Sequence, residues 1–223
     1  MAKDKTKAGG FRETPLDGSG TPRSSPPQEQ GLEFSDSLVN MYTAFKDQVY
    51  NPKSVLYPSC GFDASPSKVF DNVTFVDIED GNQGCVKKLQ EAGLHAVNQD
   101  IREYKPAEKH DLLILENPSI PTEWASRHLK SGGYVLANNY HGNASWMNKH
   151  SDEFSLVGLI NSVNDEAKIE RNKNGDLGAV LPLESIRESR PLHHLMFIHS
   201  LKTGYDEGLP FKREAEIYIF TKK

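Results

Sequence analysis

Apolar residues recur with two different periods after residue 33, and the two periods predict helices and strands in alternation. In the first segment the spacing is three and four residues, which is the period of a helix that buries one face. Ser35 is placed to cap the start of this helix, and Asn51-Pro52 marks its end. Its buried face is expected to consist of Phe34, Leu38, Met41, Tyr42, Phe45 and Val49.

The chain continues as short apolar runs separated by helical stretches. One helix is predicted around Val86 and Leu89, up to Gly93. A second has a face made of Trp124, Ala125, His128 and Leu129, before Gly132-Gly133. Apolar runs bounded by turn residues are typical of buried strands. The expected strands are Ser54–Tyr57, Val73–Ile78, His95–Asn98, Asp111–Glu116, Tyr134–Ala137, Phe154–Ile160 and Glu216–Phe220.

This alternation predicts an α/β fold, in which a doubly wound, mostly parallel sheet of about seven strands has helices on both faces. Residues 1–32 hold almost no large apolar side chain, so they are expected to form a disordered polar tail. Residues 33–223 are expected to form a single domain. Within it, 162–213 is less regular and is interpreted as an insertion or loop region. A run from Leu192 to Leu201 is interpreted as a helix, although a strand also fits.

Composition excludes several classes of protein. A net charge of −5 and a pI near 5.9 argue against a generally basic, nucleic-acid-coating surface. Two cysteines are too few for a disulfide framework and fit a reducing compartment. No stretch has the apolar length of a membrane span or a signal peptide, so a cytoplasmic location is expected. No metal site is expected, because His193, His194 and His199 lack carboxylates at ligand spacing.

Ligands of an open parallel sheet bind outside the carboxyl ends of the strands, so we looked for chemistry there. The first strand is followed by a turn in which Gly61 allows close backbone approach and Ser65 can cap a short helix. Free N–H groups at such a turn favour a carboxylate or phosphate ligand, and Asp63 adds an acceptor. The alternative is a plain strand-to-helix turn with a buried structural Cys60.

Acidic and amide side chains end the next three strands. Asp77 can accept both hydroxyls of a ribose, although a solvated acidic loop is the alternative. Asp100 can accept from an adenine amino group while Ile101 packs on the ring, unless both belong to a surface turn. Glu116 and Asn117 are placed to hold or deprotonate a substrate amine or hydroxyl, although Asn-Pro is also a common turn. The 138–153 segment, with Tyr140, His141 and Trp146, is expected to be a loop over the same cleft.

The order of these features resembles the class I S-adenosylmethionine (SAM)-dependent methyltransferases from about residue 35 onward. Leu129-Lys-Ser-Gly-Gly-Tyr-Val-Leu136 is similar to the helix-to-strand-five turn of that family, and the last apolar run matches its antiparallel terminal strand. The resemblance implies SAM as cofactor and a methyl acceptor of undefined class near Glu116 and Asn117. The cofactor-binding residues that it implies are Tyr57, Pro58, Ser59, Gly61, Asp63, Ser65, Asp77, Ile78, Asp100 and Ile101.

The first turn departs from the family pattern. Tyr57, Ser59 and Asp63 stand where the family has an acid and two glycines, which suggests that Asp63 binds the methionine ammonium. Two other functions therefore stay open. One is a non-catalytic methyltransferase-like binding module, and the other is a Rossmann-type nucleotide or NAD-binding enzyme.

Overall fold

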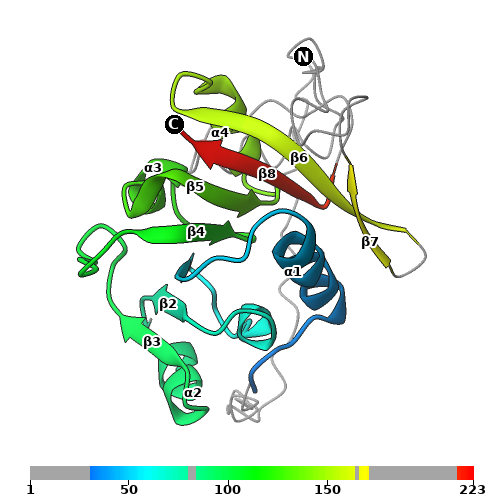
Figure 1. Cartoon of the computed structure of the whole chain (residues 1–223). Coiled ribbons are helices and arrows are strands. Elements are labelled where there is room, and N and C mark those ends of the chain that lie inside the picture. Colours follow the sequence, from blue (N-terminus) through cyan, green and yellow to red (C-terminus); the bar gives the residue numbers. More distant parts are fainter. Residues whose placement is uncertain (1–30, 80–83, 164–165, 171–214) are drawn as a thin grey trace, which may run out of the picture.

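The computed structural model describes residues 31–79, 84–163, 166–170 and 215–223 (Figure 1). They form one eight-stranded sheet in the order β3-β2-β1-β4-β5-β8-β6-β7. The strands are β1 Val55–Pro58, β2 Val73–Asp77, β3 His95–Asn98, β4 His110–Leu115, β5 Leu129–Ala137, β6 Phe154–Val163, β7 Glu166–Glu170 and β8 Ile217–Lys222.

Strands β1 to β5 are parallel to their neighbours, with Tyr57 opposite Phe75 and Val55 opposite Leu112. Strand β8 lies antiparallel between β5 and β6, and β7 adds an antiparallel edge. The expected doubly wound α/β fold with an antiparallel terminal strand is confirmed. The chain leaves β1 toward β3 and returns to β4 on the other side of β1, so the strand order reverses between β1 and β4.

Helices cover both faces of the sheet (Figure 1). Helices α1 (Asp36–Gln48) and α2 (Cys85–Glu91) share one apolar core with the sheet, and Val69 and Phe70, which follow the short 3₁₀ helix η1 (Ser65–Lys68), belong to the same core. Helices α3 (Thr122–Ser126) and α4 (Asn143–Lys149) share the core on the opposite face. Each helix in the described residues is too short or too polar to traverse a bilayer.

Helix α1 begins as expected and differs at one position of its buried face. The Ser35 Oγ accepts a hydrogen bond from the Leu38 N–H at 3.3 Å, as an N-cap does. Phe34 lies before the helix and is 44% exposed, with the Lys68 ammonium 4.4 Å from its ring centre. Phe34 is therefore a surface residue, whereas Tyr42 and Phe45 are fully buried.

The segment expected to turn from a helix into the fifth strand is itself mostly strand. Helix α3 ends at Ser126, because the carbonyl of His128 already accepts the His110 N–H at 2.8 Å and Leu129 pairs with His110. Gly132 has a φ of 76°, and a Cβ on Gly133 would lie 2.8 Å from Leu129 Cδ1. The two glycines thus serve an irregularity inside β5 and do not stop a helix.

Two elements were not expected. Residues 138–153 were interpreted as a loop but include α4, and residues 162–213 were interpreted as loop but include β7. The tail expected at 1–32 lies outside the described residues up to residue 30, as do the Leu192–Leu201 helix and the three histidines within it.

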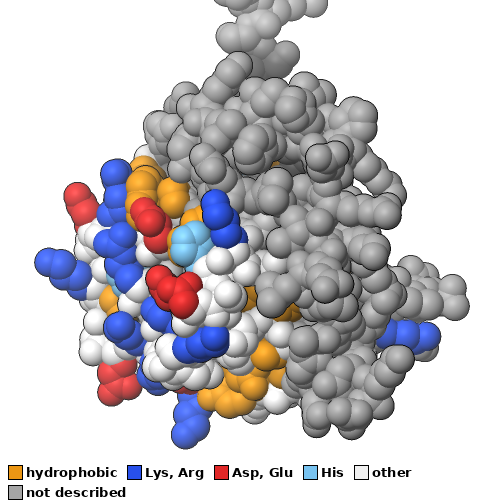
Figure 2. All heavy atoms as spheres, turned by 90° about the horizontal axis from the view of Figure 1, so that it is seen from above, with side chains coloured by type: hydrophobic (Ala, Val, Ile, Leu, Met, Phe, Trp, Pro, Cys, Tyr) orange, Lys and Arg blue, Asp and Glu red, His pale blue; other side chains and the backbone are white. Residues whose placement is uncertain are grey.

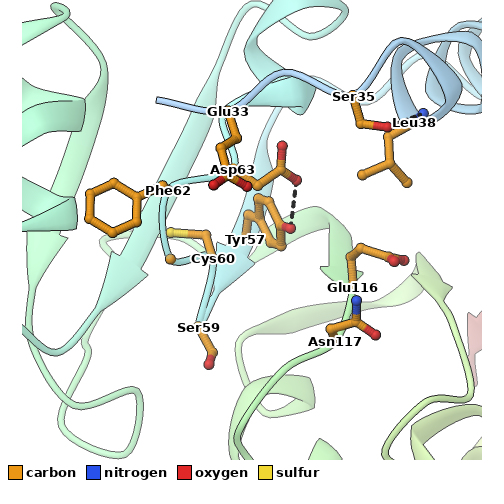
Figure 3. A pocket seen from close by; sticks show the side chains of 11 residues that line it. Glu33, Ser35, Leu38, Tyr57, Ser59, Cys60, Phe62, Asp63, Glu116 and Asn117 are labelled. Atoms are coloured by element: carbon orange, nitrogen blue, oxygen red, sulfur yellow. Dashed lines mark hydrogen bonds between the residues drawn. The ribbon is translucent and has the colours of Figure 1, made fainter. Parts of the chain in front are cut away.

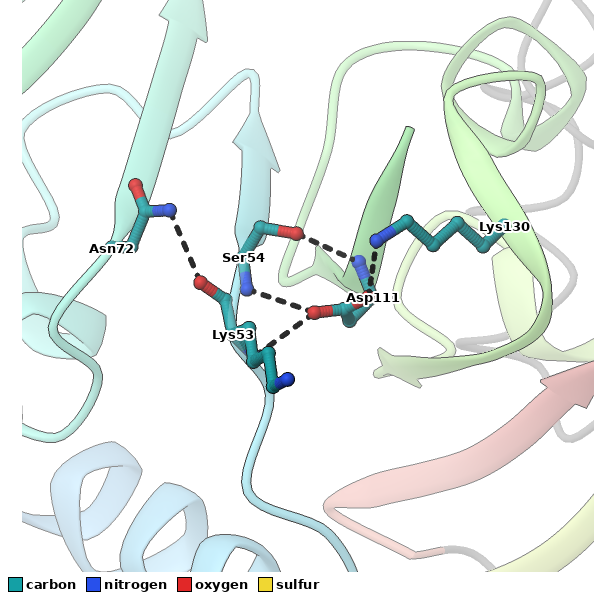
Figure 4. Close-up of polar contacts among 5 residues, drawn as sticks. All are labelled: Lys53, Ser54, Asn72, Asp111 and Lys130. Atoms are coloured by element: carbon teal, nitrogen blue, oxygen red, sulfur yellow. Dashed lines mark hydrogen bonds and ion pairs between the residues drawn. The ribbon is translucent and has the colours of Figure 1, made fainter. Parts of the chain in front are cut away.

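A carboxylate ties together the amino ends of β1 and β4 (Figure 4). One oxygen of Asp111 accepts from the backbone N–H groups of Lys53 and Ser54 at 2.9 and 3.1 Å. The other accepts from the Lys130 ammonium at 2.7 Å. Burial alone would raise the pKa of Asp111, but Lys130 and the two N–H donors more than offset it and lower the pKa.

Candidate functional site

Two adjoining cavities open where the strand order reverses. The acidic cavity, of about 550 Å³, lies between α1, the turn after β1 and the end of β4 (Figure 3). The mixed cavity, of about 480 Å³, lies between the ends of β1, β2 and β3 and the start of α3. Ser59 and Gly61 line both, so the turn after β1 is their common wall. The acidic cavity is lined by Glu33, Ser35, Leu38, Tyr57, Ser59, Cys60, Gly61, Phe62, Asp63, Glu116 and Asn117.

The turn after β1 is held in a left-handed conformation. Ser59 and Gly61 have φ values of 52° and 55°, and a Cβ on Gly61 would meet no atom within 4 Å. The positive φ therefore favours glycine at position 61, and the space that a Cβ would occupy is empty of atoms from the described residues. The Gly61 N–H donates to Asp77 at 2.8 Å, and the Ser59 Oγ accepts from the Ser119 N–H at 3.0 Å. The turn is thus hydrogen-bonded to the last residue of β2 and to the segment that follows β4.

Asp63 stabilises this turn by accepting hydrogen bonds from Tyr57 and Ser65. Its Oδ2 accepts from the Tyr57 hydroxyl at 2.8 Å, and its Oδ1 accepts from the Ser65 N–H at 2.9 Å and from the Ser65 hydroxyl. Ser65 is fully buried and is the first residue of η1, whose N-cap, Ala64, makes no side-chain bond. The expectation that Ser65 caps a helix is therefore wrong.

Two N–H groups of the turn that was expected to bind an anion already have partners. The N–H groups of Gly61 and Ser65 donate to the chain's own carboxylates, Asp77 and Asp63. Carboxylates at these positions repel a second anion at short range. The turn is consequently a place for a neutral or positively charged group.

Glu116 lies on the opposite wall of the acidic cavity, at the end of β4. Among the described residues it accepts one hydrogen bond, from Asn138 Nδ2 to its Oε1 at 2.8 Å. Burial, together with the charges of Asp63 and Glu216 and against the Asn138 bond, raises the pKa of Glu116 to about 7. The same Asn138 amide donates to Asn117 Oδ1 at 2.6 Å, and Asn117 has a φ of 48°. Asn138, the first residue after β5, therefore orients both.

The charges of these carboxylates act on a buried phenol. Tyr42, on α1, is fully buried, and its hydroxyl has no hydrogen-bond partner among the described residues. Burial and then the charges of Glu116 and Asp63 raise its pKa. A buried hydroxyl without a partner is costly, so its position calls for an explanation.

The third carboxylate of the acidic cavity belongs to the segment before α1. Glu33 pairs with the turn through its backbone, since its N–H donates to the Phe62 carbonyl and its carbonyl accepts from the Ala64 N–H, both at 2.9 Å. Figure 3 shows the Glu33 and Asp63 side chains close together on one wall and Glu116 on another. No Lys, Arg or His from the described ranges lines this cavity.

The mixed cavity combines carboxylates with apolar side chains. Asp77 accepts from the Gly61 and Ile78 N–H groups at 2.8 Å each, which leaves lone pairs on both oxygens. Its pKa is raised by burial, against these two bonds and a further one from the Cys60 thiol. Ile78 is 54% exposed. The cavity is lined by Ser59, Gly61, Val76, Asp77, Ile78, Gln99, Asp100, Ile101, Arg102, Ser119, Ile120 and Trp124.

Asp100 does not stand free in this cavity. It binds the Arg102 guanidinium through both oxygens, with Arg102 Nε at 3.0 Å from each. The guanidinium in turn lies 4.6 Å from the Trp124 ring centre. Asp100, Arg102 and Trp124 thus form one wall of the cavity. Both Asp100 oxygens already accept from Arg102, so they have little capacity to accept a hydrogen bond from a ligand.

The structure brings ten of the twelve expected site residues to the cavities. Glu116 and Asn117 line the acidic cavity with Tyr57 and Asp63. The remaining ones line the mixed cavity or both, except Pro58 and Ser65, which line neither. The sequence reasoning missed Glu33, Arg102 and Trp124. No pattern in the sequence indicated Glu33, because it precedes the first periodic segment. Arg102 could have been found, because a basic residue directly after Asp100-Ile101 is placed to pair with Asp100.

The loop side chains expected over the cleft make local contacts instead. Tyr140 is 56% exposed, and its ring packs edge-on against His141. Trp146 stacks on His150 with ring centres 3.8 Å apart. No group of His, Cys, Asp and Glu in the described part of the chain is arranged to hold a metal ion.

Charge in the acidic cavity contrasts with charge on the surface. On the face in Figure 2, blue Lys and Arg side chains lie next to red Asp and Glu side chains over the described residues. Only carboxylates line the acidic cavity among ionisable Asp, Glu, Lys, Arg and His side chains of those residues. The cavity therefore has a local selectivity for cations that the net charge does not reveal.

No protein-family model matches this sequence, and no curated protein does. Solved structures similar to it include an N-methyltransferase from Bradyrhizobium japonicum in complex with S-adenosyl-L-homocysteine (SAH), at 12% identity and a TM-score of 0.39, covering 60% of this chain and 82% of that one. A sugar N-methyltransferase from Streptoalloteichus has 11% identity and a TM-score of 0.44, covering 98% and 100%.

The resemblance to class I methyltransferases holds for the fold, since the sheet has the doubly wound order and the antiparallel terminal strand that it implies. Identities and TM-scores of this size do not extend to cofactor or substrate. Both have to be inferred from the two cavities.

Proposed function

We propose that this protein is a SAM-dependent methyltransferase. The observation that carries the proposal is the pairing of an acidic cavity with a mixed cavity across Ser59 and Gly61, at the point where the strand order reverses. A ligand that spans both would be a nucleoside at one end and a cation at the other. SAM has this form, because it joins an adenosine to a sulfonium and to a methionine end whose ammonium and carboxylate leave the cofactor with a net positive charge.

The residues of the mixed cavity fit the nucleoside. Asp77 retains free lone pairs on both oxygens for the two ribose hydroxyls. Ile78, Ile101 and Trp124 supply apolar surface for the adenine ring. Asp100 is paired with Arg102, so its role is to hold Arg102 and Trp124 as a wall and not to bind adenine by itself.

The residues of the acidic cavity fit the cationic end. Asp63 already accepts three hydrogen bonds, so it holds the turn and contributes its negative charge to the methionine ammonium. When bound, the cofactor supplies a methyl group activated by the positive sulfur. Glu116 and Asn117, oriented by Asn138, would contact the methyl acceptor on the opposite wall.

A dinucleotide cofactor fits this site less well. The pyrophosphate of NAD would have to pass the turn after β1, where Asp63, Asp77 and Glu116 are close and the N–H groups of Gly61 and Ser65 are already used. Like charges at this distance disfavour an anion. A positively charged SAM meets the opposite condition.

Calorimetric titration of the full-length protein with SAM, SAH and NAD tests the proposal. SAM and SAH are expected to bind, and NAD is expected to bind more weakly. The variant Asp77→Asn keeps an acceptor for the Gly61 N–H but loses the charge, so SAH affinity should fall about tenfold or more. Glu91→Gln, on the exposed face of α2, makes the same kind of change away from both cavities and serves as control.

Two outcomes would overturn the proposal. A folded protein that binds neither SAM nor SAH would instead be a methyltransferase-like module without cofactor. Tighter binding of NAD than of SAM would make it a Rossmann-type nucleotide enzyme.

A further inference from the structure

We propose that the acidic cavity takes the methyl acceptor as a protonated amine, and that Glu116 receives the proton that this amine gives up. The inference rests on the proposed methyltransferase function and deepens it, because it names the class of acceptor. It depends on three features: the sign of the cavity's charge, the Oε2 of Glu116, which accepts no hydrogen bond from the described residues, and a buried hydroxyl on α1.

Charge is the first feature. Glu33, Asp63 and Glu116 all line the cavity, and Glu216 lies close enough to affect Glu116. No basic side chain among the described residues lines it to neutralise them. An acceptor bearing a carboxylate or phosphate would be repelled, and a neutral alcohol would gain only the single hydrogen bond that its hydroxyl can donate. An ammonium group gains from each carboxylate.

Availability distinguishes the carboxylates from one another. Asp63 is committed to Tyr57 and Ser65 through three bonds. Glu116 accepts one bond within the described residues, from Asn138 to its Oε1, so its Oε2 is open for a donor. The chain therefore offers one oriented carboxylate oxygen at the end of β4, where an acceptor would face the cofactor.

The Tyr42 hydroxyl is the third feature. It is fully buried and has no partner among the described residues, and Tyr42 does not itself line the cavity. Burial and then the charges of Glu116 and Asp63 raise its pKa, so it stays a neutral hydroxyl that adds no positive charge behind the cavity wall.

Leu38 and Phe62 complete the cavity with apolar surface. Leu38 comes from α1 and Phe62 from the turn after β1, so apolar side chains lie beside the carboxylates. A ligand with a short apolar body and a terminal ammonium matches this combination. The preferred acceptor class is thus a primary or secondary alkylamine.

The proton balance follows from this placement. An alkylammonium ion has no free electron pair, so it first gives one proton to the Glu116 carboxylate. The nitrogen pair then forms the bond to the methyl carbon, the sulfur–methyl pair returns to sulfur as a neutral thioether, and the product leaves as a methylated ammonium ion. Glu116 passes the proton to solvent.

The acid–base properties of Glu116 suit this step. A pKa of about 7 keeps Glu116 largely ionised at pH 8 and yet able to accept a proton. The groups that face it are Asp63, Glu216, Tyr42 and Asn138. Asp63 and Glu216 both favour its protonated form, and the Asn138 bond opposes them.

A set of three probes with the same body tests the inference: 2-phenylethylamine, 2-phenylethanol and 3-phenylpropionate. Binding to the full-length protein is measured by calorimetry at pH 8, with and without saturating SAH. The amine is expected to bind about tenfold or more tightly than the alcohol, and the acid more weakly than both. Mass spectrometry with SAM as donor should then find an N-methylated product.

Variants assign the preference to residues. Glu116→Gln should bring the amine-to-alcohol ratio to within about twofold of one, with affinity for the alcohol unchanged. Glu33→Gln, at the exposed rim, should lower the ratio by about twofold, since solvent screens its charge. Glu91→Gln should keep the full ratio.

The two proposals fail in different ways. If SAH binds but the amine binds no better than the alcohol, or if the preference survives Glu116→Gln, the amine inference is wrong and the methyltransferase function stands. If the amine is preferred but SAH and SAM do not bind, the methyltransferase function is wrong, and the amine is then not a methyl acceptor.

Discussion

Strand β4 carries a carboxylate near each end, and the two have opposite environments. Asp111, at the amino end, accepts from two backbone N–H groups and one ammonium, and its pKa is lowered. Glu116, just past the carboxyl end, accepts from one amide within the described residues, and its pKa is raised to about 7. Asp111 is buried and Glu116 is half-buried, and burial acts in the same direction on both, toward a higher pKa.

The difference lies in what the chain supplies around each group. At the amino end two backbone N–H groups and one ammonium donate to Asp111, and this carboxylate stabilises the fold. At the carboxyl end Asp63 and Glu216 add negative charge around Glu116, and the described residues supply one donor, Asn138, which is the arrangement expected of a site that a ligand completes. The same strand thus supports the sheet at one end and a cavity at the other.

Removing the first carboxylate should cause the largest loss of stability. Asp111→Ala leaves the Lys53 and Ser54 N–H groups without their partner, so unfolding free energy should fall by about 2–4 kcal/mol. Urea unfolding at pH 7 measures this. Affinity for SAH, measured below the new midpoint, should be unchanged, and a matching loss of affinity would show that the two ends are coupled.

Removing the Glu116 carboxylate should raise the free energy of unfolding at neutral to basic pH, whereas removing Asp111 lowers it. The pKa of Glu116 is higher in the folded protein than in the unfolded chain, so its contribution to stability is complete below about pH 4.5 and is lost as pH rises through about 7. Glu116→Gln removes this loss. At pH 8 the variant should be more stable than the wild type by on the order of 2 kcal/mol, and at pH 4.5 the two should be equal.

Urea midpoints of Glu116→Gln at several pH values between 4.5 and 8 provide the measurement, with Glu91→Gln as the control that should show no such trend. A variant less stable than the wild type at pH 8 would mean that Glu116 is a structural acceptor like Asp111.

Gly61→Ala separates stability from binding at the carboxyl end. A non-glycine residue at a φ of 55° costs about 1 kcal/mol, and no protein atom obstructs the new Cβ. The methyl group would instead project into the space shared by the two cavities, so SAH affinity should fall more than stability does. Parallel calorimetry and urea unfolding compare the two, and intact affinity would place the ligand elsewhere.

Lys130→Gln should have the smallest effect. The Lys130 side chain is 42% exposed, so solvent screens its ion pair with Asp111 and the pair contributes little to stability. Unfolding at low and high salt should show a small loss that salt removes. A loss as large as that of Asp111→Ala would mean that the ammonium, and not the backbone pair, is the main partner of Asp111.

The sheet was predictable because its central strands β1, β2 and β4 are buried on both faces, so their apolar runs stand out in the sequence. His95–Asn98 was placed at its observed bounds, and β1, β2 and β4 within a residue at each end. Strand β7 and helix α4 were missed because neither has a run of apolar residues. Leu129 was assigned to a helix because its apolar character does not tell a helix from a strand, and only its pairing with His110 decides it.

The site was predictable as a set of positions and not as a set of partners. The ends of parallel strands meet at one edge, so Asp77, Asp100 and Glu116 could be placed near one another from their order alone. That Asp100 binds Arg102, and that Asp63 binds Tyr57 and Ser65, depends on rotamers and turn geometry that the pattern of residues does not contain. The free carboxylate therefore emerges only from the structure.

The pairing of Glu33 with the turn after β1 sets a limit on how far the chain can be shortened. Its backbone bonds to Phe62 and Ala64 close one side of the acidic cavity, although Glu33 itself precedes the first helix. A fragment that starts at Ser35 would keep every helix and strand described and yet lose this wall. The smallest fragment that retains the site therefore begins at or before residue 33.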